Sequence, residues 1–370
     1  MAVNSDWTTF ANEAFRLSLV RAKDDKASLT TREAYEGFHP TFTYPIYGED
    51  EKLYGYKDLI IDLKFASGSL AQYLHVSYLD KLPSTSTVDD VEGMLAKFIP
   101  EGYHTSLPDF EAQVESDALS FKPMGHKIHA YSRPANTGAG AASSVDGEAT
   151  EDERAQSLLE DTVEFEVYHC TWNTPGFREF HRRVQLFILL YIEGGSYISE
   201  EEDSWEFVVL YERRRRRSDP NIATYHFVGY SSLYPFYCFP EKVRLRLSQF
   251  VILPPYQQEG HGSALYTAIY NYVLKQPNVA ELTVEDPAEA FEDLRDRNDL
   301  KMLLTHERFM HEAFGDEADG HSLTHHGNGK GKAKARKAMM GPPVEKFWLE
   351  KRRVEMKIAS VSVWVLGMVI

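Results

Sequence analysis

Cysteine is scarce in this chain, which has only Cys170 and Cys238 among its 370 residues. Two cysteines cannot build the disulfide framework of a small secreted protein, nor a cysteine-rich zinc site. We therefore expect a reducing compartment and no metal. Each cysteine lies in an apolar, aromatic run, where a buried structural thiol is more common than a nucleophile.

Long apolar runs are missing as well. Residues 1–19 bring in Asp, Asn and Glu too early to supply the apolar core of a secretory signal. The apolar residues 359–370 fall well short of the ~20 that are needed to cross a bilayer. We expect no membrane association, and we expect the protein in the nucleus and the cytoplasm.

Basic side chains are outnumbered, because 40 Lys and Arg stand against 56 Asp and Glu, for a formal net charge of −16. This charge disfavours binding to the phosphates of nucleic acid and favours a cationic partner. An acidic surface that only keeps the protein in solution explains the same number. We expect no direct nucleic-acid partner.

The chain does contain enough apolar material for a folded protein, with 43% hydrophobic and 13% aromatic residues. Its length exceeds that of a usual single core, so two or three packed units are expected. The patterns predict an N-terminal α+β domain at 1–132 and a flexible linker at 133–158. A second α/β domain is predicted at 159–290, followed by a helical region at 291–370 with a disordered loop at about 315–343.

A strand, a turn, a helix and a second strand follow one another between residues 245 and 285. Pro254 and Pro255 end the first strand, because proline cannot donate to a sheet ladder. The helix is predicted at 262–276 and the second strand at 279–285. This order predicts a right-handed crossover onto a parallel pair of strands.

Five consecutive arginines, 213–217, follow an apolar strand. The simplest interpretation is a solvated hairpin tip. Contact with nucleic acid or with an acidic chaperone is the alternative.

The turn before the predicted helix carries the pattern Gln-x-x-Gly-x-Gly. Its glycines, Gly260 and Gly262, let the backbone approach a ligand, and the free amides at the start of the helix can hold a pyrophosphate. Glycine also serves many such turns for steric reasons alone. The turn lacks the third glycine of a dinucleotide-binding fold and the Gly-Lys-Ser/Thr of a phosphate-binding loop.

Residues 248–270, SQFVILPPYQQEGHGSALYTAIY, and 282–299, LTVEDPAEAFEDLRDRND, resemble the type B histone acetyltransferase family of the GNAT superfamily. The likeness extends more loosely over 160–300 and more weakly over 44–59. The resemblance implies an α/β (α+β) fold: a GNAT acyltransferase core with a mixed, mostly antiparallel sheet and a parallel, splayed strand pair. An N-terminal α+β domain and a C-terminal helical segment would complete it.

The resemblance also implies acetyl-coenzyme A as co-substrate. Its pantetheine arm would pair with the strand residues Phe250, Val251 and Ile252, which an ordinary core strand explains equally. Its pyrophosphate would lie on the turn residues Gln257, Gln258, Glu259, Gly260, His261, Gly262 and Ser263. Ala288 stands where relatives often carry a polar side chain near the cofactor.

Lysine is almost wholly protonated near neutral pH, so acetyl transfer needs a group that removes a proton from the amine. A carboxylate in a partly apolar site suits this step. By the resemblance, Glu285 is the base, and Asp286 and Glu193 are acids close to the amine. A plain acid at the entry of the following helix is the other interpretation of Glu285.

The substrate side is also carried over from the resemblance. The acidic residues Glu49, Asp50 and Glu51 would contact the histone tail, and the aromatic segment Tyr234, Pro235 and Phe236, with Trp205, would line its groove. Acidic loops attract Lys and Arg, and aromatic faces hold a cation and its stem. Charged loops are also often merely solvated, and aromatic side chains at strand ends are often core.

These observations predict a histone lysine acetyltransferase that acts on free histone four, alone or with histone three, by direct attack in a ternary complex. A WD-repeat histone-binding subunit is the implied partner. The alternatives are an acetyltransferase for another protein or a polyamine, and a non-catalytic histone-binding chaperone module.

Overall fold

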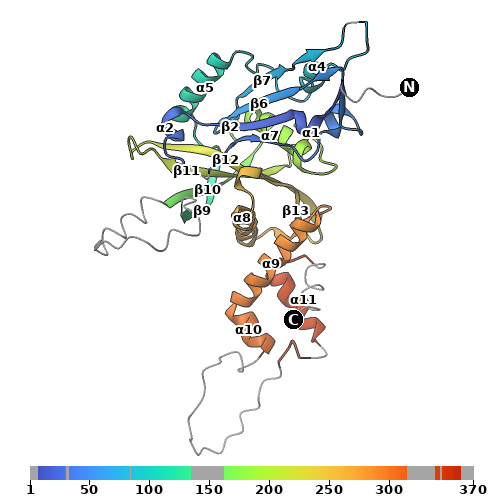
Figure 1. Cartoon of the computed structure of the whole chain (residues 1–370). Coiled ribbons are helices and arrows are strands. Elements are labelled where there is room, and N and C mark those ends of the chain that lie inside the picture. Colours follow the sequence, from blue (N-terminus) through green and yellow to red (C-terminus); the bar gives the residue numbers. More distant parts are fainter. Residues whose placement is uncertain are drawn as a thin grey trace, which may run out of the picture. The chain divides into compact units, whose positions relative to one another are not determined.

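The computed structural model describes residues 7–30, 33–83, 85–134, 162–314, 338–341 and 344–359 (Figure 1). The predicted linker 133–158 lies outside the described residues except for its first two, and the loop 315–343 except for 338–341. The chain forms two compact units, residues 1–232 with 249–261, and residues 233–248 with 262–370. The predicted domain boundaries stay predictions. No helix in the described ranges is long and apolar enough to cross a membrane.

The N-terminal part of the first unit is built on a four-stranded sheet in the order β3-β2-β6-β7. Its strands are β2 (Phe15–Val20), β3 (Glu36–Phe38), β6 (Ile60–Ala66) and β7 (Gln72–Ser77). Two short pairs accompany it, β1 (Thr8–Phe10) with β4 (Lys52–Tyr54) and β5 (Tyr56–Lys57) with β8 (Asp80–Lys81). Ile61, Leu63 and Phe65 of β6 alternate along the strand and are fully buried, as expected where one face of a strand meets a core.

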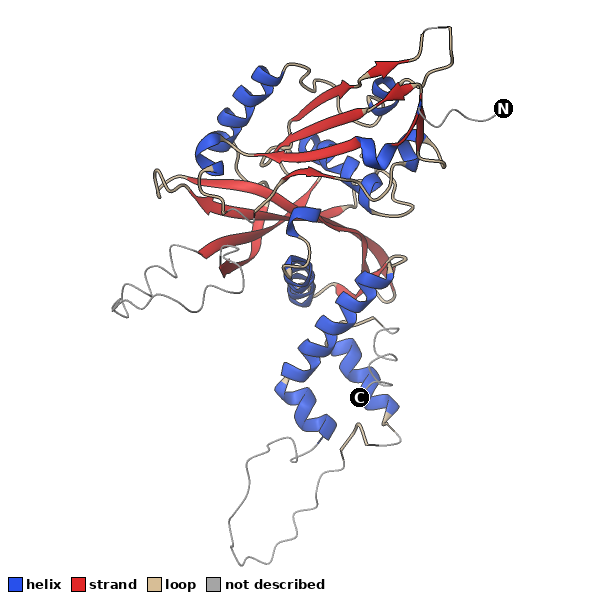
Figure 2. Cartoon of the chain, in the orientation of Figure 1, coloured by secondary structure: helices blue, strands red, loops and turns tan. Residues whose placement is uncertain are grey.

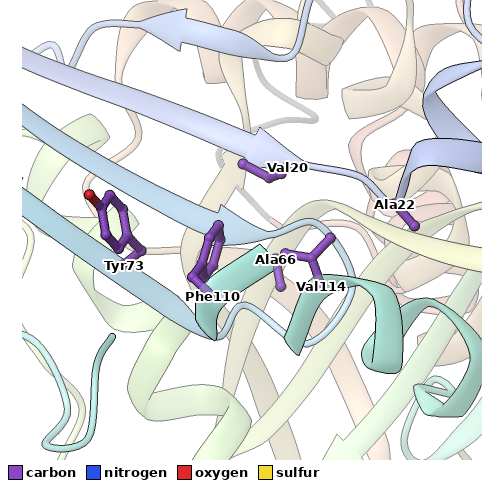
Figure 3. Close-up of a cluster of buried hydrophobic side chains, with 6 residues drawn as sticks. All are labelled: Val20, Ala22, Ala66, Tyr73, Phe110 and Val114. Carbon is purple, nitrogen blue, oxygen red and sulfur yellow. The ribbon is translucent and has the colours of Figure 1, made fainter. Parts of the chain in front are cut away.

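Short helices connect these strands, namely α1 (Ala11–Ala14), α2 (Lys23–Lys26), α3 (Tyr44–Tyr47) and α4 (Val91–Leu95). The longer α5 (Leu107–Ser120) packs on the sheet through Phe110 and Val114. Figure 3 shows these two side chains against Val20, Ala66 and Tyr73 of the sheet. This cluster gives the N-terminal sheet a core of its own.

A six-stranded sheet follows in the order β14-β13-β12-β11-β10-β9. Its strands, red in Figure 2, are β9 (His126–Pro134), β10 (Thr162–Thr171), β11 (Glu206–Arg215), β12 (Ala223–Cys238), β13 (Lys242–Ile252) and β14 (Val279–Val284). β10 is antiparallel to both β9 and β11, whereas β13 and β14 are parallel. The prediction of a mixed, mostly antiparallel sheet with one parallel pair is confirmed.

The apolar stretch before residue 192 forms a helix, α7 (Phe177–Tyr191). Apolar and aromatic residues dominate its second half, Val184–Tyr191, and most of them are buried. One polar member, His181, is fully buried and lies 2.8 Å from the hydroxyl of Tyr230. Burial lowers the pKa of His181 to about 3, so the ring is neutral in the folded protein.

The second unit contains the parallel pair and the C-terminal helices α8 (His261–Lys275), α9 (Glu289–Thr305), α10 (Glu307–Phe314) and α11 (Lys346–Glu355). The pairing of β13 with β14 covers Val243–Leu247, and the amide of Glu285 then donates to the carbonyl of Leu247 at 2.9 Å. β13 continues to Ile252 beyond this last bond. The two strands therefore part at Ser248, as predicted for a splayed pair.

The arginine run lies at the end of β11, before β12, and only part of it is solvated, because Arg215 and Arg217 are exposed. Arg214 and Arg216 are only 8% and 7% exposed. Arg214 pairs with Glu33 and Glu212, and Arg216 lies 2.7 Å from Asp25. The prediction was wrong for these two residues because burial of an arginine depends on acids far away in the sequence.

Candidate functional site

The turn that leads into α8 exposes its backbone. A 3₁₀ turn at Pro254–Tyr256 ends β13, and the side-chain amide of Gln257 donates back to the carbonyl of Ile252 at 2.8 Å. Gln258 and Gly260 have φ angles of 61° and 76°, in the left-handed region. Residues 257–260 are exposed, and α8 begins directly after them. Because the first amides of a helix have no intrahelical acceptor, this turn can bind an anion through its main chain.

His261, the first residue of α8, turns its side chain inward. The ring is only 4% exposed, lies 4.4 Å from the ring of Phe165 between centroids, and is hydrogen-bonded to the hydroxyl of Tyr131 at 2.7 Å. Burial, and next the charge of Arg133, lower the pKa of His261 to about 4. The residue is therefore a neutral anchor for the start of the helix, and its contribution to a ligand is limited to its backbone.

Arg133 adds a cation that the sequence interpretation missed. Its guanidinium donates to the carbonyl of Gly260 at 3.0 Å and lies 5.3 Å from the ring centroid of Tyr131. The turn has no cation of its own, and Glu259 gives it a negative charge. Arg133 precedes Gly260 by 127 residues and belongs to β9, although composition assigned it to the first position of the linker. Only the pairing of β9 in the sheet could have revealed it.

Past the turn, the predicted cofactor residues lie in different settings. Ser263 of α8 accepts a hydrogen bond from the side-chain amide of Asn298 at 3.0 Å, and Gly262 is half-buried. Ala288 is exposed and precedes α9 as its N-cap. Its methyl group offers no hydrogen bond to the helix or to a ligand.

The strand residues before the turn are partly core. Val251 and Ile252 are 4% and 8% exposed, whereas Phe250 is half-buried. Gly229 of β12 allows close packing here, because a Cβ at that position would lie 2.6 Å from the carbonyl oxygen of Val251. The strand therefore fills a core, and its main chain beyond Ser248 has parted from β14.

Glu285 stands at the fork of the parallel pair. Its carboxylate accepts a hydrogen bond from the hydroxyl of Ser248, and a guanidinium nitrogen of Arg246 lies 3.8 Å away. The Glu285 side chain is 45% exposed. Asp286 follows with a φ of 32° and is also exposed. The fork thus presents a solvent-accessible carboxylate that the hydroxyl of Ser248 orients.

Glu193 lies in the exposed loop after α7, and two hydrogen bonds hold this loop in place. The amide of Gly194 donates to the hydroxyl of Tyr44 at 2.7 Å, and the side chain of Gln249 donates to the carbonyl of Ser196 at 2.8 Å. Gln249 is itself 8% exposed. The sequence interpretation did not single out Tyr44 or Gln249.

The same tyrosine connects this loop to the predicted acidic stretch. The carboxylate of Glu51 accepts from the amides of Thr43 and Tyr44 at 2.6 and 3.0 Å, and from Asn12 at 3.2 Å. Glu51 therefore caps the start of α3, and its carboxylate is held by the fold. Glu49 and Asp50 are exposed. Tyr44 therefore links Glu51 to Gly194, the residue after Glu193.

The predicted aromatic segment lies at the end of β12. The rings of Tyr234 and Phe236 are 4.9 Å apart between centroids, and Phe236 is 38% exposed. Arg246 lies over the Phe236 ring at 4.2 Å. Pro235, the residue between these two in the sequence, is half-buried. Trp205, which belongs to the first unit, is also half-buried.

The two cysteines lie in different settings: Cys238, at the end of β12, is only half-buried, so the expectation of a buried thiol holds for Cys170 alone. Cys170 is buried, donates to the carbonyl of Met124 at 3.2 Å, and burial raises its pKa to about 12. Such a thiol is not a nucleophile near neutral pH. In the ranges that the structure describes, no group of three or more His, Cys, Asp or Glu side chains could hold a metal ion.

The fold and these features define a class. A mixed sheet with a parallel strand pair at its edge, a glycine turn between those two strands and a carboxylate after the second is that of a GNAT acyltransferase.

Comparisons with known proteins lead from the class to the family. Residues 7–193 match the family described as "Histone acetyl transferase HAT1 N-terminus". The chain is 54% identical over 306 residues to the histone acetyltransferase type B catalytic subunit of Cryptococcus neoformans. The aligned region covers 81% of this chain and 72% of that protein. Identity to the subunit of the same name from Mycosarcoma maydis is 45% over 328 residues, covering 87% and 67%. The human subunit is 32% identical over 288 residues, covering 77% and 62%.

The chain therefore belongs to the family of type B histone acetyltransferase catalytic subunits, and it is an enzyme, a histone acetyltransferase. Among solved structures, an aminoglycoside acetyltransferase from an uncultured soil metagenomic sample aligns with 45% of this chain and 95% of its own, at 11% identity and a TM-score of 0.26.

Proposed function

We propose that this enzyme transfers the acetyl group of acetyl-coenzyme A to a lysine side chain of free histone four, alone or with histone three. The observation that carries the proposal is the fork of β13 and β14, where Glu285 follows the last paired residue and is oriented by Ser248. The fork leaves strand backbone without its parallel neighbour and sets a carboxylate at the same point of β13.

The co-substrate would be bound mainly by main chain. The turn at 257–263 offers helix amides to the pyrophosphate, and Arg133 adds positive charge beside Gly260. The amide groups of pantetheine can pair with β13 at Phe250 to Ile252 in the manner of an added strand. Glu259 is exposed at the turn and would lie away from the phosphates.

In the proposed reaction the Glu285 carboxylate accepts a proton from the lysine ammonium, directly or through water. The neutral amine then attacks the thioester carbonyl, a carbon–nitrogen bond forms, and the carbon–sulfur bond breaks. The coenzyme leaves as a thiolate, which takes up the second proton of the attacking nitrogen. Holding both substrates in one ternary complex replaces a covalent intermediate by positioning, which agrees with the buried, weakly acidic Cys170.

Several features support a histone tail as acceptor. The net charge is −16, and Glu49 and Asp50 are exposed acids, which attract a basic tail. Phe236 offers an exposed ring for a lysine stem and its cation. The names of the relatives give histones as the substrate of those proteins. A WD-repeat histone-binding subunit as partner, and residence in the nucleus and the cytoplasm, complete the proposal by the resemblance of the sequence.

The test is an acetyl-transfer assay with labelled acetyl-coenzyme A on a histone four tail peptide, a shuffled basic peptide and spermidine. We expect transfer to the histone four peptide at a kcat/KM at least about tenfold above the other two acceptors. Faster transfer to spermidine would identify a polyamine acetyltransferase. Thermal unfolding with acetyl-coenzyme A is measured in parallel, because binding to the folded state raises the midpoint. No rise, together with histone binding, would identify a chaperone.

A further inference from the structure

Arg246 lies in an unusual position on β13. Its guanidinium carbon is 4.2 Å from the ring centroid of Phe236, and its nearest nitrogen is 3.8 Å from the carboxylate of Glu285. An aromatic face and a carboxylate together recognise a lysine side chain. The ring contacts the aliphatic stem and the cation, and the carboxylate pairs with the positive charge. In the structure, Arg246 of the enzyme itself lies between these two groups.

The neighbouring Arg244 differs in how tightly it is held. It lies on the same face of β13, two residues earlier, and its guanidinium is hydrogen-bonded to Glu281, which also pairs with Arg353 at 2.6 Å. The 3.8 Å contact of Arg246 with Glu285 is too long for a hydrogen bond. Its side chain is 34% exposed, and an ion pair at this distance and exposure is worth little. Arg246 can therefore leave Glu285 at small cost.

We propose that Arg246 is a positioning residue that holds the place of the substrate ammonium in the free enzyme, between the Phe236 ring and the Glu285 carboxylate, and that the acceptor lysine displaces it. This inference rests on the proposed role of Glu285 as base. The lysine then meets a ring and a carboxylate that are already oriented. Phe236 is kept exposed, and Glu285 is kept near Ser248, until the lysine arrives.

The exchange of Arg246 for the lysine ammonium leaves one cation beside Glu285 before and after the lysine binds. The other charged groups of the fork are Asp286, next in the chain, and the cluster of Glu281 with Arg244 and Arg353, one step back along the strands. When the lysine replaces Arg246, the carboxylate loses one cation and gains the ammonium that it is to deprotonate.

The experiment compares Arg246→Gln with the parent enzyme on the histone four peptide. We expect a KM for the peptide about threefold or more lower, because no internal cation competes. The kcat at saturating peptide should stay within about threefold, because Arg246 has already left the site when the lysine is bound. Arg246→Lys keeps the competing cation and should restore the parent KM. Arg246→Met serves as a second neutral variant should the Gln variant unfold.

Two further variants separate the explanations. Arg244→Gln removes a cross-strand ion pair of the same face without touching Glu285, so it should lower thermal stability but leave the KM for the peptide unchanged. If the Arg246→Gln variant behaves in the same way, Arg246 is structural and the inference is overturned. If Glu285→Gln retains parental turnover, the proposed function of Glu285 has failed instead, whatever the Arg246 variants do.

Discussion

In the proposed function, the turn at 257–263 and the fork at Glu285 act through different parts of the chain. In the turn, His261 is buried and the side chain of Gln257 bonds to the carbonyl of Ile252, so the main chain is left to meet a ligand. In the fork, the carboxylate of Glu285 accepts from the hydroxyl of Ser248, and these side chains would carry the chemistry. The turn should therefore depend on conformation and the fork on functional groups.

The largest loss of activity that this comparison predicts is that of Glu285→Gln. The amide has the same shape but cannot accept the proton, so kcat on the histone four peptide should fall by about 10²–10⁴-fold. The dissociation constant of acetyl-coenzyme A, measured by calorimetry, should stay within about threefold. Turnover close to the parental value would reject Glu285 as the base, and a lost affinity for the coenzyme would mean that the two regions are not separable.

A substitution that changes the conformation of the turn should instead weaken coenzyme binding and leave the chemical step largely intact. In Gly260→Ala the residue must keep a φ of 76°, and its Cβ would lie 2.9 Å from the guanidinium of Arg133. We expect the KM for acetyl-coenzyme A to rise by about tenfold or more, with kcat at saturation changed far less.

The matched control is Gly102→Ala, at a φ of 85° and with no heavy atom within 4 Å of the added Cβ. It carries the same backbone strain, about 1 kcal/mol or more, and should lower stability without raising that KM. Equal rises in KM for both variants would show that general destabilisation, and not the turn, is responsible.

The contrast between the regions also explains what the sequence could reveal. The crossover from β13 through α8 to β14, and the glycine turn within it, were predicted because all their signals lie within about forty neighbouring positions. The fork partner of Glu285 depends on which residue of β13 lies opposite, and a sequence alone does not fix that register. Ser248 and Arg246 were therefore missed as its neighbours.

Long-range ion pairs were harder still. Arg214 and Arg216 look like members of a solvated charge run, yet they are buried against acids that precede them by more than 180 residues. Glu51 looks like a free acid for a basic tail, yet its carboxylate caps α3. In each case the partner comes from tertiary packing, for which composition and periodicity carry no signal.

Arg133 offers a way to sharpen the comparison, since it is a side chain that serves the main-chain turn. Arg133→Gln removes the cation beside Gly260, so the KM for acetyl-coenzyme A should rise by about fivefold. S-acetylpantetheine lacks the phosphates, and its KM should be unchanged. Equal losses for both donors would mean that Arg133 only supports the shape of the turn.

The smallest effect should appear in His261→Gln, as a change in the pH dependence of stability. The folded protein holds His261 neutral with a pKa of about 4, below the ordinary value near 6.5, so the unfolded chain binds the extra proton between these values. The stability that this histidine contributes is therefore complete above pH 6.5 and is lost as the pH falls toward 4. Urea unfolding measures the fall in the free energy of unfolding between pH 7.5 and pH 5. This fall should be about 1 kcal/mol smaller in the variant than in the parent protein. His181 and His226, buried with lowered pKa values of the same sign, keep the remaining slope, so an unchanged slope in the variant would place the His261 ring in solvent.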